Sequence, residues 1–226
     1  MIALADLARF GPLPPSRQFT GFLDESERAA LLDWALSNRD RFRPARLRGR
    51  IVDTTRRVAE KLADLGPMVE VLERRVLERL DEIFRHSGTR PFTPDHIELE
   101  LAAHGEGAFF KAHTDIPVGP GRAPLGGDGT GRHDRLVSAV YYFHREPKGF
   151  SGGALRLYRF GDRDCEADFT EYQPEQNSLL VFPSWARHEV RRVSCPSGAF
   201  EDYRFAVNIW LCSVLEDSSP QRPPTP

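Results

Sequence analysis

Cysteine is scarce in this sequence, and its three residues are widely separated. Cys165, Cys195 and Cys212 form neither an even disulfide set nor a Cys-x-x-Cys metal motif. The start, Met1–Leu7, lacks a basic segment followed by a long apolar one, so no secretory signal is predicted. We therefore expect a cytoplasmic protein with reduced thiols.

Long hydrophobic runs and a large excess of one charge are also absent. No apolar stretch is long enough to span a bilayer, so no membrane partner is expected. The formal net charge of −2 gives no general attraction to nucleic acid. Nothing in the composition indicates an oligomeric state.

The apolar residues that are present suffice for one sizeable domain with a helical extension, since they make up 40% of 226 residues. Asp24 and Glu27 have the spacing of a capping box and predict a helix over 25–37. Apolar residues at helical spacing predict a longer helix over 67–86, ending near Gly88 and packed on a sheet.

After residue 91 the hydrophobic period changes from helical to two. Residues 96–103 alternate polar and apolar side chains, which predicts a half-buried strand. His96, Glu98 and Glu100 share its polar face, and we interpret that face as exposed to solvent. A metal site on this face is the less favoured alternative.

Several further short strands are separated by glycine and proline, as in an antiparallel barrel or jelly roll. They are predicted over 136–143, 152–158, 178–182, 188–193 and 204–211. The last two are expected to pair as a hairpin around a loop at 194–203. The fold class is therefore α+β, mainly β. The expected organisation is a helical support region (1–90), a barrel domain (91–214) and a disordered tail (215–226).

Three side chains far apart in the sequence have the chemistry of a metal site. His113 and Asp115 are separated by one residue and would point to the same side of a strand. With His188 they would supply the two imidazoles and one carboxylate of a facial triad, which holds non-haem Fe(II) with open positions. The Gly/Pro-rich segment 116–134, directly after the first two ligands, is expected to be a loop or lid.

A bidentate 2-oxo acid could occupy two open positions and leave one for dioxygen. Arg204 begins an apolar strand and is the candidate for binding the far carboxylate of such a co-substrate. Arg191 and Arg192 are competitors. Tyr141 could donate a hydrogen bond to the same carboxylate or simply pack in the core. The arginines within 40–57 could form an anion-binding rim, but we favour a solvated surface.

Several segments, in this order, resemble the prolyl hydroxylase group of the 2-oxoglutarate/Fe(II) dioxygenases. They are Gly-x-Gly followed by 110–115, then 138–143, 151–158, 182–190 and 204–211. The resemblance covers roughly residues 95–212 and implies a double-stranded β-helix. It departs where the family's hypoxia-type members carry a tyrosine, because Ala103 stands there with His104 beside it.

The resemblance implies that His113, Asp115 and His188 bind iron and that Arg204, assisted by Tyr141, binds 2-oxoglutarate. The cofactors would be Fe(II), 2-oxoglutarate and O2, with ascorbate as an optional addition. The expected reaction is hydroxylation of an unactivated C–H bond of a prolyl, amino-acid, peptidyl or other small-molecule substrate, with release of succinate and CO2. The alternatives are demethylation of a modified nucleobase and a non-catalytic metal-binding or oxygen-sensing barrel.

Overall fold

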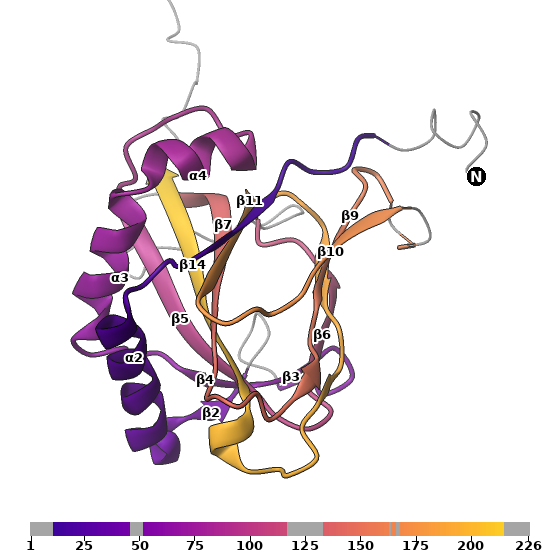
Figure 1. Cartoon of the computed structure of the whole chain (residues 1–226). Helices are drawn as coiled ribbons and strands as arrows, with labels where there is room; N and C mark the ends of the chain where they lie inside the picture. Colours follow the sequence, from indigo (N-terminus) through magenta and orange to yellow (C-terminus); the bar gives the residue numbers. More distant parts are fainter. Residues whose placement is uncertain (1–10, 46–51, 117–132, 163, 166–167, 215–226) are drawn as a thin grey trace, which may run out of the picture.

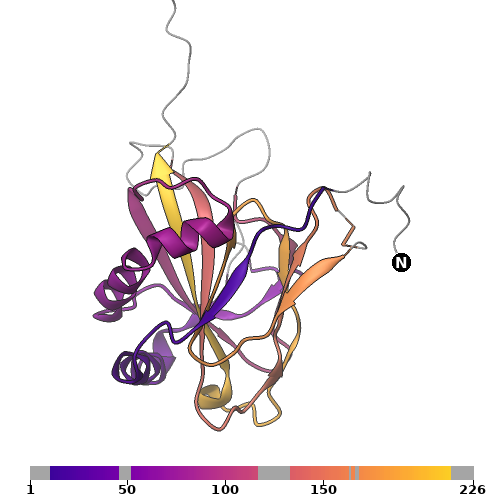
Figure 2. The same cartoon turned by 45° about the horizontal axis from the view of Figure 1, so that its top comes forward.

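Two antiparallel sheets face each other, and three helices cover the outer side of the larger one (Figures 1 and 2). The computed structural model describes residues 11–45, 52–116, 133–162, 164–165 and 168–214. Among these residues, none of the helices has the length and apolar character needed to cross a membrane. Cys165, Cys195 and Cys212 form no disulfide in the structure.

The larger sheet has seven strands. In spatial order they are β1 (Arg17–Thr20), β11 (Ser178–Pro183), β7 (His133–Phe143), β14 (Arg204–Val214), β5 (His96–His104), β4 (Glu60–Leu62) and β2 (Arg43–Pro44). The smaller sheet has five strands. They are β10 (Phe169–Tyr172), β9 (Leu155–Tyr158), β12 (His188–Val190), β6 (Phe109–His113) and β3 (Arg57–Val58). A short pair, β8 (Ser151–Gly152) and β13 (Val193–Ser194), makes a third sheet.

The first predicted helix is confirmed as α2 (Glu25–Ser37), with the capping box of Asp24 and Glu27 in place. The single helix predicted over 67–86 is wrong, because the chain forms α3 (Met68–Leu77) and α4 (Leu80–Ser87). The break lets α4 turn across the sheet and pack against β11 (Figure 1). Gly88 ends α4 in a left-handed conformation.

Two apolar layers follow from the alternation of side chains along the central strands. One face of the larger sheet packs against the helices, for example through Leu101, Tyr141 and Val207. The opposite face meets the smaller sheet through residues such as Tyr142 and Leu157. Both faces of the larger sheet are therefore covered, by helices on one side and by the second sheet on the other.

The predicted pairing of 188–193 with 204–211 is wrong. β14 pairs with β5 and β7 in the larger sheet, whereas β12 pairs with β6 and β9 in the smaller one. The two segments thus belong to facing sheets. This places Arg204 across the interior from His188.

The first ninety residues contribute more than helices. β1, β2 and β4 extend the larger sheet, and β3 extends the smaller one. The division at residue 90 stays a prediction, as does the tail at 215–226, which lies outside the described residues. Most of the expected loop at 116–134 lies outside them too.

Candidate active site

The three predicted metal ligands lie together where strands β6 and β12 of the smaller sheet pair. His113 ends β6, His188 begins β12, and the two are paired directly in register. Their ligand atoms and those of Asp115 all lie within 4.8 Å of one another. The Asp115 carboxylate oxygens lie 3.8 Å from Nε2 of His113 and 3.8 Å from Nε2 of His188.

Backbone carbonyls set the orientation of both imidazoles. Nδ1 of His113 donates to the carbonyl of Lys111, and Nδ1 of His188 donates to that of Ala186, each at 2.9 Å. This places the proton on Nδ1 and leaves the lone pair of each Nε2 free to bind a metal ion. Metal-binding histidines are usually held in this way.

The carboxylate is fixed by the larger sheet. The Ser138 hydroxyl on β7 donates to Asp115 at 2.7 Å. Burial raises the pKa of Asp115, but the neighbouring imidazoles and hydrogen bonds lower it to about 2. Burial lowers the pKa of His113 to about 3. An ionised carboxylate and a neutral imidazole are the forms that bind a metal ion, so the donor set fits Fe(II).

A cavity of about 430 Å³ opens beside the triad. Val140, Leu155 and Val190 supply apolar parts of its wall. Its volume lies in the range of small-molecule sites. Arg204 also lines this cavity, so one continuous space joins the triad to a buried cation.

Arg204 is almost fully buried, with 1% of its surface exposed. Its Nη1 donates to Nδ1 of His104 at 3.2 Å, but Nε and Nη2 have no hydrogen-bond partner. Burial lowers its pKa from the usual value. Burying a guanidinium with two unpaired donors costs free energy unless an anion accepts their hydrogen bonds. A carboxylate can accept two parallel hydrogen bonds from a guanidinium.

His104 supplies a neutral donor next to this cation. Because an arginine cannot accept, Nδ1 of His104 is the acceptor, and its proton is therefore on Nε2. Burial and the nearby Arg204 hold the pKa of His104 well below its ordinary value. His104 lines the cavity. It therefore supplies a hydrogen-bond donor next to Ala103, the residue that replaces the tyrosine of the hypoxia-type members.

The expected contact of Tyr141 with the co-substrate is corrected by the structure. Tyr141 faces the helices, and its hydroxyl donates to Asn177 at 3.1 Å. Tyr142, the next residue on β7, faces the interior with its hydroxyl unpartnered. The Arg204 guanidinium lies 4.8 Å from the centre of its ring. Adjacent residues of a strand point to opposite faces. Tyr142 therefore has the position beside Arg204 that was expected for Tyr141.

The competing arginines lie elsewhere. Arg191 is exposed and pairs with Glu189 at 2.9 Å. Arg192 donates to the carbonyl of Gly107 and lies over the ring of Phe109. Neither belongs to the cavity lining among the described residues.

Two residues differ from the predicted solvent exposure. Glu100 faces the cavity, because both sides of β5 are covered and its polar side looks into the interior. Arg57, from the arginine-rich segment expected to be solvated, is 8% exposed and lines the same cavity. Lys61 and Asn208 complete this polar wall, and both contact Glu100.

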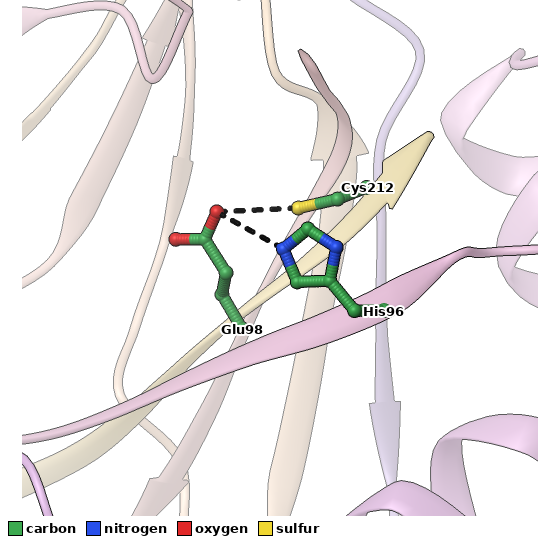
Figure 3. A group of neighbouring side chains, drawn as sticks. All are labelled: His96, Glu98 and Cys212. Atoms are coloured by element: carbon green, nitrogen blue, oxygen red, sulfur yellow. Dashed lines mark hydrogen bonds and ion pairs between the residues drawn. The ribbon is translucent and has the colours of Figure 1, made fainter. Parts of the chain in front are cut away.

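A second cluster lies at the far end of β5, where His96, Glu98 and Cys212 meet (Figure 3). Glu98 accepts from the Cys212 thiol at 3.3 Å and from Nε of Arg135 at 3.0 Å. Burial and Glu98 raise the pKa of Cys212, which keeps the thiol protonated. With its carboxylate already paired to Arg135, this cluster is better suited to orienting that arginine over Trp210 than to binding a metal.

Comparison with known proteins agrees with this geometry. A family model described as the 2OG-Fe(II) oxygenase superfamily matches residues 99–212, half of the chain. An uncharacterised PKHD-type hydroxylase of Synechocystis is 36% identical over 145 residues, which is 62% of this chain. The chain spans 44% of the length of that relative.

Solved structures share the fold. A Pseudomonas putida prolyl-4-hydroxylase matches with a TM-score of 0.59 and 21% identity, over 92% of this chain and 96% of that one. A Trichoplax adhaerens prolyl hydroxylase, in complex with a hypoxia inducible factor peptide, matches with a TM-score of 0.62 and 19% identity, over 87% and 83%. The predicted double-stranded β-helix is thereby confirmed. The chain belongs to the 2OG-Fe(II) oxygenase superfamily.

Proposed function

We propose that this protein hydroxylates an unactivated C–H bond of a prolyl or other amino-acid or peptidyl substrate. The reaction would consume O2 and convert 2-oxoglutarate into succinate and CO2. The observation that carries the proposal is that one cavity is lined by both the His113–Asp115–His188 triad and the orphan donors of Arg204. Bound Fe(II) would supply the oxidative chemistry.

The protein's own side chains bind, orient and shield. His113, Asp115 and His188 would hold the metal, and their partners Lys111 and Ala186 keep the imidazoles in place. Arg204, His104 and Tyr142 would receive the far carboxylate of 2-oxoglutarate. Apolar residues around this end of the cavity exclude water, which strengthens the ion pair.

The test is to add Fe(II) and 2-oxoglutarate to the purified protein under oxygen and to measure succinate, with and without candidate substrates. We expect slow succinate formation without substrate and faster formation with a prolyl or amino-acid substrate. The variant His113→Ala should form none. If the wild-type protein binds iron but never forms succinate, the proposal fails.

A further inference from the structure

A second buried cation lines the cavity and is not needed for 2-oxoglutarate. Arg57 on β3 is 8% exposed, and its Nε has no hydrogen-bond partner. Its guanidinium lies 4.5 Å from the centre of the Phe110 ring, and that ring stacks on His113 at 3.6 Å. Arg57 and the predicted metal ligand His113 therefore contact the same aromatic ring.

The nearest carboxylate pairs with this group but also serves a second cation. Glu100 lies 3.4 Å from Nη2 of Arg57, a long contact, and its other oxygen pairs with the Lys61 ammonium. Asn208 also donates to Glu100 at 3.2 Å. One carboxylate thus serves two cations and an amide, which leaves one positive charge in excess at this wall.

The other charged groups that line the cavity have their own partners or face solvent. Asp115 belongs to the metal site, and Arg135 pairs with Glu98. Arg56 is exposed, so water can solvate its charge. The two carboxylates of 2-oxoglutarate would go to the metal and to Arg204. The excess positive charge at this wall is then left for the substrate.

We propose that Arg57 and Lys61 form a subsite for a free carboxylate of the substrate. The inference rests on the proposed function and narrows it: the substrate is a free amino acid or the C-terminal residue of a peptide. An internal residue carries only neutral amides there, and would leave Arg57 and Lys61 to share the single carboxylate of Glu100. An arginine with a free Nε can bind a carboxylate by two parallel hydrogen bonds.

The first test compares matched probes on the wild-type protein. Free amino acids and N-acetyl amino acids are each compared with the corresponding amide, so that the two members of a pair differ in the charge of the terminal group. With Fe(II), 2-oxoglutarate and O2, we expect an acid to stimulate succinate formation and to give a hydroxylated product. The kcat/KM of its amide should be lower by about tenfold or more, which corresponds to one charge-assisted hydrogen bond.

Equal stimulation by acids and amides, or stimulation by amides alone, would overturn the subsite. If neither series stimulates while substrate-free succinate formation persists, the subsite is again refuted and the proposed function still stands. Absence of succinate under every condition would remove the proposed function itself, and this inference with it.

The second test uses variants of Arg57. Arg57→Gln should raise the KM for the acid roughly tenfold or more, and Arg57→Lys, which keeps the charge, should recover part of that loss. Arg41→Gln, at an exposed arginine paired with Asp64, is the control for removing a cation. If Arg57→Gln instead raises the KM for 2-oxoglutarate as strongly, Arg57 serves the co-substrate and the proposal is wrong. Should that variant fail to fold, Arg57→Lys and the acid–amide comparison still decide.

Discussion

At the scale of single residues, the site is defined by polar atoms that the protein buries without satisfying. Arg204 keeps two donors unpaired, and Tyr142 keeps its hydroxyl unpaired beside it. Folding the chain around such groups costs free energy that a bound carboxylate would restore. These unpaired buried atoms therefore indicate the chemical class of the ligand more specifically than the volume of the cavity does.

Replacing Arg204 by methionine should raise the KM for 2-oxoglutarate roughly ten- to a hundredfold, because charge-assisted hydrogen bonds are lost. Steady-state succinate formation at varied 2-oxoglutarate measures this. Arg191→Gln is the matched control, since Arg191 is exposed and lies outside the cavity lining. An unchanged KM in Arg204→Met would mean that another cation binds the far carboxylate.

The two neighbouring tyrosines give a sharper comparison. Tyr142→Phe should raise the KM for 2-oxoglutarate several-fold, because its buried hydroxyl is unpaired and its ring lies beside Arg204. Tyr141→Phe should leave that KM unchanged and lower the free energy of unfolding by about 1 kcal/mol, since only its hydrogen bond to Asn177 is lost. Kinetics and urea unfolding of both variants test this, and reversed effects would contradict the face assignment.

At the scale of elements, turns place the strands that carry the site. Gly153 stands between β8 and β9 with φ +71°, and a Cβ there would lie 2.6 Å from Cδ of Arg204. Glycine is required at this position both for its backbone conformation and for the close approach of the arginine.

Gly153→Ala should therefore raise the KM for 2-oxoglutarate and lower the melting temperature. A nearby matched control is Gly161→Ala, also at positive φ (+85°), where the added methyl group would have no atom within 4 Å. That variant should lose stability from its strained backbone while its KM stays unchanged. Equal KM changes in both would show that strain alone, and not contact with Arg204, causes the effect.

The capping box of α2 is a purely structural element. Asp24→Ala removes the side-chain bond to the backbone N–H of Glu27 and should lower the free energy of unfolding by about 1 kcal/mol. The helix packs on the outer face of the larger sheet, away from the cavity. Chemical denaturation should show the loss, and succinate formation by the folded variant should match that of the wild-type protein.

At the scale of the whole molecule, the two sheets are joined through the metal site. His113 and His188 come from the smaller sheet, while Ser138 of the larger sheet holds Asp115. Metal binding should therefore stabilise the whole fold. Anaerobic Fe(II) at about a hundred times its Kd should raise the melting temperature by roughly 5–10 °C.

Removing the metal with a chelator should reverse that shift. His188→Ala should melt at the same temperature with and without Fe(II), because one of the three ligands is gone. Differential scanning calorimetry or fluorimetry measures both. A metal-dependent shift that survives in His188→Ala would place the ion elsewhere, and the cluster of His96, Glu98 and Cys212 would then be the next site to test.

Local pattern and residue chemistry alone predicted α2, most strands and the ligand set of His113, Asp115 and His188. Those predictions need only neighbours in the sequence, the period of the apolar residues, and the kinds of atom that bind iron. The same holds for Arg204, since a charged residue opening an apolar strand requires a buried partner.

Only the tertiary structure decided which side of each strand faces the cavity. Alternation distinguishes the two faces of β5 and β7, but when helices cover one and a second sheet the other, both are buried. Glu100 and Tyr142 therefore face the interior. The sequence had predicted solvent exposure for Glu100, and it had predicted the co-substrate contact for Tyr141. The pairing of β14 with β5 and β7 likewise depends on contacts between residues far apart in the sequence, such as Arg204 with His104 and Phe205 with Phe143, which no local signal contains.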